Sequence, residues 1–304
     1  MKVLFAAPDW QRWHGPLMDV CPEMELCRDG DPASFDALIY APGYPASGAT
    51  LDFTPFTRAR MVQSLWAGVE RIVTNRTLTQ PLCRMVDPGL AQGMAEYCAG
   101  WTLRAHLGMD NFAQDGSWRA GAQPPLAPER RVTVLGMGEM GRAAAAALRS
   151  LGFRVTGWSA SGRAVDGFEV LGASDLHRAL EQAEILICLL PDTPATRGLL
   201  NADRLAFLPK GATIINAGRG TLIVEDDLIS GLDQGRPRHA VLDVFLHEPL
   251  PPEHPFWSHP GVTVTPHVAA ATRPATASVL VADNLRRAMA GKPLLHLVDQ
   301  IRGY

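Results

Sequence analysis

The stretch Val132-Thr133-Val134-Leu135-Gly136-Met137-Gly138-Glu139-Met140-Gly141 decides the fold. A short apolar and β-branched run leads into a GxGxxG turn, and the alanine-rich residues 142–148 that follow are strongly helix-forming. This order is typical of a dinucleotide site, because the first glycine permits a tight turn, the second admits a pyrophosphate and the third lets helix and strand pack closely. A glycine-rich turn without a ligand is the alternative, and the strand–turn–helix context disfavours it.

Alternating apolar runs and helical patterns on both sides of this stretch predict parallel sheets covered by helices. In the second half of the chain the expected strands are residues 131–135, 154–158, 185–189, 213–216, 239–242 and 262–264. A weaker series near the N-terminus comprises residues 2–6, 37–40 and 71–74. We therefore expect an α/β protein with two doubly wound parallel-sheet domains, a Rossmann-type cofactor domain and a smaller flavodoxin-like substrate domain.

Two long helical patterns set the expected domain boundaries in this chain of 304 residues, which exceeds the usual single-domain size. Residues 91–107 predict one helix that joins two domains. Residues 275–290 are again helical, and no further strand series follows to which they could belong. We expect a substrate domain built from residues 1–100 and 275–304, and a dinucleotide-binding domain over residues 101–274.

Composition narrows the partners and the compartment. The net charge is −3 and the basic residues are dispersed, so no nucleic-acid partner is expected and small molecules are favoured. Five cysteines form no CxxC pair, which indicates a reducing, cytoplasmic environment. No signal peptide and no apolar stretch of about 20 residues is present, so we expect no membrane association. The nine histidines form no HxxxH or HxH pair, and no metal site is expected.

The loop after the second strand of the cofactor domain bears on cofactor choice. An NAD enzyme places an acid there against the ribose 2′-hydroxyl, but this chain reads Trp158-Ser159-Ala160-Ser161-Gly162-Arg163. The planar fork of an arginine suits a 2′-phosphate. The sequence thus favours NADP, with NAD as the alternative, unless Arg163 is merely a solvated loop residue.

Three segments of the C-terminal half each place one reactive side chain after an expected strand: Arg219, Glu248 and His267. Singly, each has a simpler explanation: a surface ion-pair partner, a solvated loop acid and a structural histidine. Together they fit reduction of a 2-ketoacid. The arginine would bind the carboxylate and polarise the carbonyl, the histidine would donate a proton, and the glutamate would orient the histidine and raise its pKa. The hydride must come from a nicotinamide.

From about residue 35 to its end the chain resembles the D-isomer-specific 2-hydroxyacid dehydrogenase family. The resemblance rests on the GxGxxG stretch and on residues 190–198, 216–220, 243–250 and 265–267. It implies that Arg219, Glu248 and His267 are the catalytic residues, that Asp243 lies near the nicotinamide carboxamide, and that the protein forms a homodimer. The implied cofactor contacts are Gly136, Gly138, Glu139, Met140, Gly141, Trp158, Ser159, Ser161, Arg163, Leu190, Pro191, Thr196, Ala217, Gly218 and Asp243.

Within that family, residues 94–97 and the serine-containing loop are most similar to the glyoxylate/hydroxypyruvate reductase A type, a branch that favours NADPH. The substrate-carboxylate loop of the family corresponds to residues 65–69. Backbone N–H groups around Trp66, Ala67 and Gly68 would bind the substrate carboxylate alongside Arg219, with His267 on the reacting carbonyl. Trp66 replaces a usually smaller residue and so affects the expected pocket size.

Two other readings compete with a reductase of glyoxylate or hydroxypyruvate type. One is a dinucleotide-sensing binding protein with the same fold, against which the complete set of Arg219, Glu248 and His267 argues, because a sensor needs no proton donor. The other is a dehydrogenase that acts on a different small acid, such as formate or phosphite.

Overall fold

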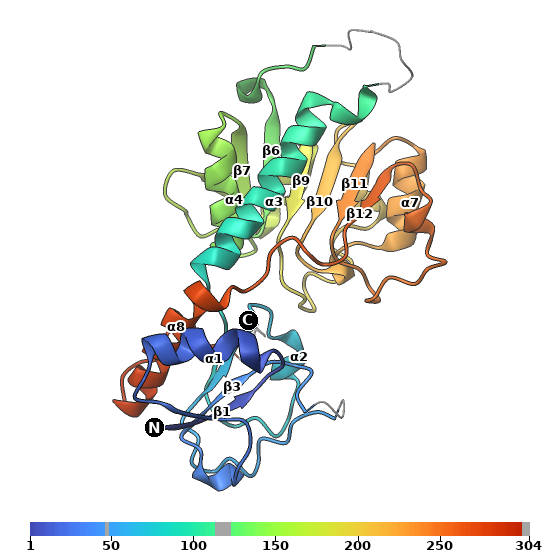
Figure 1. Cartoon of the computed structure of the whole chain (residues 1–304). Helices are drawn as coiled ribbons and strands as arrows, with labels where there is room; N and C mark the ends of the chain where they lie inside the picture. Colours follow the sequence, from blue (N-terminus) through green and yellow to red (C-terminus); the bar gives the residue numbers. More distant parts are fainter. Residues whose placement is uncertain (46–48, 113–122, 300–304) are drawn as a thin grey trace. The chain divides into compact units, whose positions relative to one another are not determined.

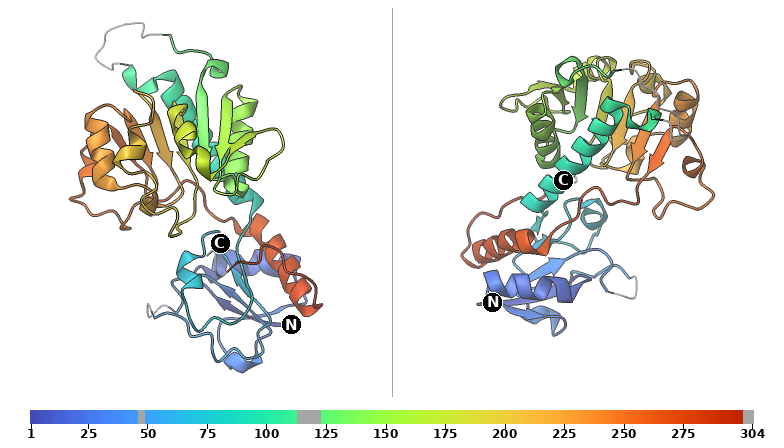
Figure 2. Two further views of the ribbon diagram at one scale, coloured as in Figure 1. Left: turned by 180° about the vertical axis from the view of Figure 1, so that it is seen from behind. Right: turned by 45° about the horizontal axis from the view of Figure 1, so that its top comes forward.

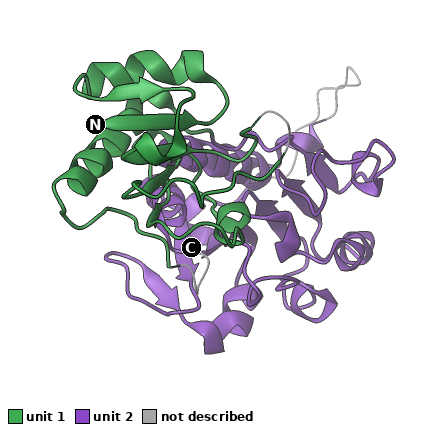
Figure 3. Ribbon diagram, turned by 90° about the horizontal axis from the view of Figure 1, so that it is seen from below, with its two compact units in different colours: residues 1–90, 271–304 green, residues 91–270 purple. Residues whose placement is uncertain are grey.

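The computed structural model describes residues 1–45, 49–112 and 123–299. By its internal contacts the chain divides into two units, Met1–Leu90 with Ala271–Tyr304 and Ala91–Ala270 (Figure 3). The chain thus leaves the first unit, builds the whole second unit and returns. The contact-based division falls at 90/91 and 270/271, whereas the predicted domain boundaries fall at 100/101 and 274/275; those domains remain a prediction.

Unit 2 is built on a seven-stranded parallel sheet in the order β12-β11-β10-β9-β6-β7-β8 (Figure 1). Its strands are β6 (Arg131–Leu135), β7 (Arg154–Trp158), β8 (Glu169–Leu171), β9 (Ile185–Cys188), β10 (Thr213–Asn216), β11 (His239–Leu242) and β12 (Val262–Val264). Chain order reverses beside β6, where β7 lies on one side and β9 on the other. Loops that diverge at such a switch point leave a crevice at the carboxyl ends of the strands.

Apolar side chains on alternate strand positions cover both faces of this sheet, as a buried parallel sheet requires. Ile215 and Val241 pack with residues of α3 (Pro88–Leu107) and α4 (Glu139–Ser150) on one face. Ile214 and Leu242 pack on the other face with residues of α5 (Leu176–Glu181), α6 (Ala202–Leu205) and α7 (Glu225–Asp233). Figure 2, left, shows this second face with α5 in yellow-green and α7 in orange.

Unit 1 holds a five-stranded parallel sheet in the order β2-β1-β3-β4-β5, the flavodoxin-like order. Its elements are β1 (Lys2–Ala6), α1 (Trp10–Val20), β2 (Glu25–Cys27), β3 (Ala37–Tyr40), β4 (Val62–Ser64), α2 (Glu70–Val73), β5 (Leu82–Cys83) and α8 (Pro274–Met289). Helices α1 and α8 lie side by side and share one apolar cluster with β1 and β3. The predicted fold class, two parallel-sheet domains of α/β type, is confirmed.

The sequence predictions for unit 1 were less accurate than those for unit 2. The strand predicted at residues 71–74 is wrong, because this segment lies in and just after the single turn of α2, whose Ile72 is buried. Strands β2, β4, β5 and β8 were not predicted, and each has only two or three residues. Such runs are too short to show a period of their own. Strand β9 also ends at Cys188, one residue earlier than expected.

No helix in residues 1–45, 49–112 and 123–299 is long and apolar enough to span a lipid bilayer.

A buried amide pair ties α8 to the sheet of unit 1. Asn284, fully buried, donates to Gln63 Oε1 at 2.8 Å and to Leu295 O at 3.1 Å, and its Oδ1 accepts from Leu295 N at 2.8 Å. Gln63 donates in turn to Ser64 O at 3.0 Å. The network satisfies backbone groups of two segments that are far apart in the sequence, which makes α8 an integral part of unit 1.

We expect Asn284→Leu to lower the free energy of unfolding by about 2–4 kcal/mol, because it leaves buried donors and acceptors of Leu295 and Gln63 unsatisfied. Urea unfolding measures the change. Val279→Ala on the same helix is the matched control, since Val279 is 59% exposed and should shift stability by less than about 0.5 kcal/mol. Equal unfolding midpoints for the two variants would contradict the role given to Asn284.

Candidate active site

The final residues of six strands of unit 2 lie side by side across the sheet. Strand pairing aligns Leu135 with Trp158 and Cys188, Asn216 with Cys188 and Leu242, and Leu242 with Val264. The loops that follow these residues therefore start from one edge of the sheet. All the predicted cofactor-binding and catalytic residues of unit 2 lie in these loops, at their strand ends or in the first turn of α4.

The glycines of the GxGxxG turn have three distinct geometries. Gly136 has φ +106° and lies so close to Leu189 that a Cβ would meet Leu189 O at 2.7 Å. A Cβ on Gly141 would lie 1.7 Å from Gly136 O, so the helix can pack there only against a glycine. Gly138, by contrast, has open space beside it and directly precedes α4. An open backbone position at a helix N-terminus fits a dinucleotide pyrophosphate.

Glu139 and Met140 occupy the first turn of α4, and Glu139 forms an ion pair with Arg142. Both residues follow the open position at Gly138, as a pyrophosphate-binding turn requires.

The end of β7 carries small hydroxyls and an exposed arginine. Ser161 Oγ accepts from Arg163 N at 3.3 Å and lies 3.4 Å from Ser159 Oγ. The Arg163 side chain is exposed. Trp158 is buried, and its indole Nε1 has no hydrogen-bond partner within the described ranges. This strand end therefore presents donors, and no carboxylate, over residues 158–163.

The loop after β9 contains Leu190 and Pro191, and Thr196 holds it together. Thr196 Oγ1 donates to Pro191 O at 2.6 Å and accepts from Thr193 N at 2.9 Å. Asp192 accepts two bonds from Arg197, at 2.7 and 3.2 Å, and this guanidinium lowers the pKa of the Asp192 carboxyl. Thr196 thus has a structural role in the loop.

Arg219 stands in the loop after β10, where Asn216 holds the backbone. Asn216 donates to Arg219 O at 3.1 Å and accepts from Gly218 N at 3.2 Å, while Arg219 Nη1 donates to Gly218 O at 2.7 Å. Glycines flank Arg219 on both sides in the sequence. Close packing requires both of them: a Cβ on Gly218 would meet Leu190 O at 2.9 Å, and one on Gly220 would meet the Phe245 carbonyl carbon at 2.0 Å.

Ala217, which directly precedes Gly218, was also predicted to contact the cofactor. It is buried, and its N–H donates to Cys188 O at 3.2 Å.

The buried carboxylate of Asp243 holds the loop that follows β12. Its Oδ1 accepts from Thr265 Oγ1 at 2.6 Å and from Val268 N at 2.9 Å, and its Oδ2 accepts from Ala269 N at 2.9 Å. Tyr97 of α3 lies 2.7 Å from Thr265 Oγ1, and burial raises the pKa of its hydroxyl. Because Thr265 gives its proton to Asp243, Tyr97 is the donor in that pair.

Glu248 and His267 meet at the strand ends. The distance from His267 Nδ1 to Glu248 Oε2 is 2.7 Å, and Glu248 Oε1 accepts from Phe245 N at 3.0 Å. His267 has φ +53°, an uncommon left-handed conformation, and its N–H donates to Asp243 O at 2.9 Å. The His267 side chain is 54% exposed. Among the residues that the structure describes, none bonds its second ring nitrogen, Nε2.

The predicted substrate loop lies in unit 1, directly after β4. Ser64 Oγ accepts from Trp66 N and donates to Trp66 O, each at 2.9 Å, so one hydroxyl closes the turn. Trp66 is 39% exposed, and Ala67 and Gly68 lead from it to the buried Val69 and α2. The loop thus follows a strand end, as the resemblance implies.

Four residues that the sequence analysis did not assign to the site support these loops: Tyr97, Asn216, Glu225 and Thr265. Asn216 ends a predicted strand and Thr265 follows one, and both lie in segments that carry the family resemblance; these were the signals available for them. The roles of Tyr97 and Glu225 depend on contacts with residues distant in the sequence. Among the described residues, no three or more His, Cys, Asp and Glu side chains are placed to hold a metal ion.

Comparisons with known proteins agree with this geometry. Residues 101–269 match the family model of the D-isomer specific 2-hydroxyacid dehydrogenase NAD binding domain. A glyoxylate/hydroxypyruvate reductase A of Serratia proteamaculans (strain 568) is 36% identical over the full length of both chains.

Solved structures show the same fold. A D-isomer specific 2-hydroxyacid dehydrogenase from Xanthobacter autotrophicus Py2, in complex with NADPH and MES, has a TM-score of 0.90 and 36% identity. An NADPH-dependent glyoxylate/hydroxypyruvate reductase from Sinorhizobium meliloti, in complex with NADP and sulfate, has a TM-score of 0.87 and 35% identity. Each alignment covers 100% of this chain and 99% of the other. The chain therefore belongs to the D-isomer-specific 2-hydroxyacid dehydrogenase family and is an NAD(P)-dependent enzyme of that family.

Proposed function

We propose that this enzyme uses NADPH to reduce a small 2-ketoacid, of glyoxylate or hydroxypyruvate type, to the 2-hydroxyacid. The observation that carries the proposal is the 2.7 Å contact between His267 Nδ1 and Glu248 Oε2 at the strand ends that also carry Arg219 and the open GxGxxG turn. A proton donor, its orienting carboxylate and a carboxylate-binding guanidinium in one row are what ketoacid reduction requires. When bound, the nicotinamide supplies the hydride.

His267 is the proposed proton donor. Glu248 accepts a hydrogen bond from Nδ1–H, so that Nε2 is the nitrogen that transfers its proton to the ketone oxygen as this oxygen gains negative charge. The Phe245 amide holds the other Glu248 oxygen, which keeps the carboxylate aimed at the ring. Because His267 is half exposed, it can regain a proton from solvent after each turnover.

Arg219 is the proposed substrate anchor. A guanidinium can bond both oxygens of a carboxylate and polarise the neighbouring carbonyl. Asn216 and the two close-packed glycines hold its backbone, so that the fork is presented from a rigid loop. Backbone N–H groups of Ala67 and Gly68 are the proposed second anchor for the substrate carboxylate, since the Trp66 N–H donates to Ser64 Oγ.

The preference for NADPH rests on the strand end at Trp158. Ser159, Ser161 and the exposed Arg163 provide donors for a 2′-phosphate, and no acid is present there to bind a ribose 2′-hydroxyl. The related structures with NADPH or NADP bound support this preference.

Two further expectations have partial support. A cytoplasmic location agrees with five cysteines that are all free thiols. A homodimer agrees with exposed apolar side chains at and beyond the end of α3, namely Leu107, Met109 and Phe112. Both remain predictions.

The function is tested by mixing the purified protein with NADPH and glyoxylate, hydroxypyruvate, phenylpyruvate or pyruvate and following nicotinamide absorbance. We expect turnover with the small ketoacids, and His267→Ala should lower kcat by about 10²–10⁴-fold while NADPH affinity stays the same. His247→Ala, an exposed neighbour of Glu248, is the matched control and should retain activity. NADPH binding without reduction of any ketoacid would instead favour the sensor or a dehydrogenase for another acid.

Arg163→Ala should weaken NADPH binding by about tenfold and leave NADH binding nearly unchanged, because only NADPH carries the phosphate that the guanidinium would bond. Fluorescence titration with both nucleotides measures the difference. Arg154→Ala, at the opposite end of β7, controls for the loss of positive charge. Equal weakening of NADPH and NADH binding would remove Arg163 from cofactor discrimination.

Asp243→Asn tests whether this carboxylate acts by holding the His267 loop or by contacting the cofactor. An amide cannot accept all three bonds from Thr265, Val268 and Ala269, so the His267 loop should shift and kcat should fall by about 10–100-fold with little change in the KM for NADPH. Steady-state kinetics give both values, with exposed Asp166→Asn as the control. A loss confined to NADPH affinity would show that Asp243 acts mainly on the cofactor.

A further inference from the structure

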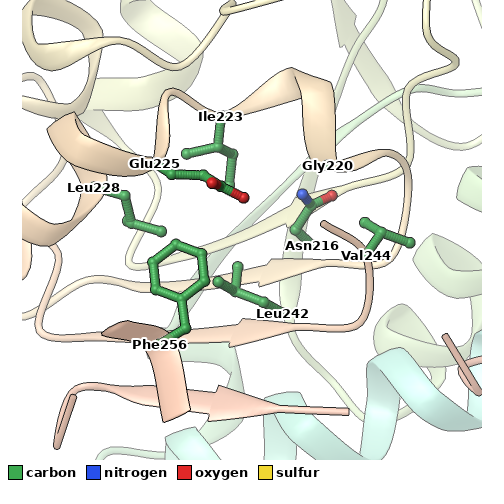
Figure 4. A pocket seen from close by; sticks show the side chains of 8 residues that line it. All are labelled: Asn216, Gly220, Ile223, Glu225, Leu228, Leu242, Val244 and Phe256. Atoms are coloured by element: carbon green, nitrogen blue, oxygen red, sulfur yellow. The ribbon is translucent and has the colours of Figure 1, made fainter. Parts of the chain in front are cut away.

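Behind the loops that carry Arg219 and Glu248 lies a small cavity with both apolar and polar lining (Figure 4). Ile223, Leu228, Leu242 and Phe256 contribute side chains to it, and Asn216 and Glu225 contribute its two polar side chains. Figure 4 shows the Glu225 carboxylate directed inward, toward the side where Asn216 lies. Asn216 supports the Arg219 loop, and the carboxylate of Glu225 bonds the neighbouring loop that carries Glu248.

Glu225 is the first residue of α7, and each of its carboxylate oxygens has a partner. Oε1 accepts from the backbone N–H of Leu246 at 3.3 Å, and Oε2 lies 3.3 Å from His254 Nε2. The Glu225 side chain is only 20% exposed. A carboxylate so largely withdrawn from water is stable only when its oxygens are bonded. Both bonds lead to the segment between β11 and β12.

His254 is oriented for this contact by a second bond. Its Nδ1 accepts from Phe256 N at 3.3 Å and so caps the short 3₁₀ helix Pro255–Trp257. A ring nitrogen that accepts carries no proton, and the proton of the neutral imidazole therefore lies on Nε2, facing Glu225. The centroid of the His254 ring also lies 4.6 Å from the centroid of the Phe256 ring. His254 thus acts as a fixed donor to Glu225.

Leu246, held by Glu225, lies two residues before Glu248. The adjacent amide of Phe245 bonds the carboxylate of Glu248 itself, at 3.0 Å. Two consecutive amides of this loop are therefore held by two different glutamates, one from α7 and one from the loop. Moving the Leu246 amide would displace the Phe245 peptide and, with it, the carboxylate that orients His267.

We propose that Glu225 and His254 are positioning residues, which hold residues 245–248 so that Glu248 faces His267. This inference rests on the proposed function, and it extends the mechanism to a pair that does not touch the reacting groups. The Glu225 carboxylate and the helix-capping His254 form one support behind the proposed proton donor.

The first test needs no activity. Glu225→Ala should raise amide hydrogen exchange in residues 244–249, measured by mass spectrometry, while exchange in β10 stays at the wild-type rate. Asp226→Ala, an exposed acid in the same helical turn, is the matched control. Unchanged exchange in residues 244–249 would overturn the proposal even if the protein reduces no ketoacid, so failure of the proposed function is detected separately.

The second test asks whether Glu225 acts through Glu248. We expect Glu225→Ala to lower kcat by about tenfold in the wild-type background but by less than about twofold in a Glu248→Ala background, because residues that act through one another are not additive. The KM for NADPH should stay the same within about twofold in each background. An equal loss in both backgrounds would indicate a general structural effect and would overturn the proposal.

Two conservative variants sharpen the assignment. Glu225→Gln keeps an oxygen for the Leu246 amide and should restore part of the activity lost in Glu225→Ala. His254→Asn can still cap the 3₁₀ helix but loses the contact with Glu225, so kcat should fall by about two- to tenfold, the effect of one hydrogen bond. Wild-type kcat in His254→Asn would show that capping alone accounts for His254.

Discussion

The arrangement of this site depends on the burial of one negative charge. Asp243 is 1% exposed, and a carboxylate removed from water must be bonded by donors from the protein. The hydroxyl of Thr265 and the amides of Val268 and Ala269 meet that need. The chain must bend around the carboxylate to supply these donors. His267 lies between Thr265 and Val268 in this bend and takes up a left-handed backbone conformation. The position of His267, the proposed proton donor, thus follows from the hydrogen bonds that the Asp243 carboxylate requires.

A second constraint is the close approach of backbones at the strand ends. The loop after β10 touches the loop after β11 at Gly220 and the loop after β9 at Gly218, and the turn after β6 touches the segment after β9 at Gly136. None of these contacts leaves space for a Cβ. The loops that carry Arg219 and Glu248 therefore support each other directly, and Glu225 and Asn216 fill the polar positions behind them. Rigidity of this kind suits a mechanism in which small displacements of the reacting groups reduce the rate strongly.

The sequence was most informative where β-branched and apolar runs met unusual turn residues. Strands β6, β7, β10, β11 and β12 were predicted with their observed bounds, and Arg219, Glu248 and His267 were singled out because each follows such a strand. The short strands of unit 1 were missed because two or three residues show no period and because, unlike the equally short β12, they hold at most one β-branched residue each. The segment from Arg71 to Thr74 was misread because its β-branched residues favour a strand, whereas it lies in and just after the turn of α2. Glu225 and Tyr97 could not be assigned, since their partners lie 29 and 168 residues away in the chain.

The discontinuity of unit 1 affects the order in which the two units can fold during synthesis on the ribosome. The apolar cluster shared by β1, β3 and α1 is completed by α8, which is synthesised after all of unit 2. All of unit 2 emerges before α8 does, so its sheet can close while the first ninety residues still lack one wall of their core. Unit 2 is thus able to fold first, and α8 must pack against α1, β1 and β3 afterwards.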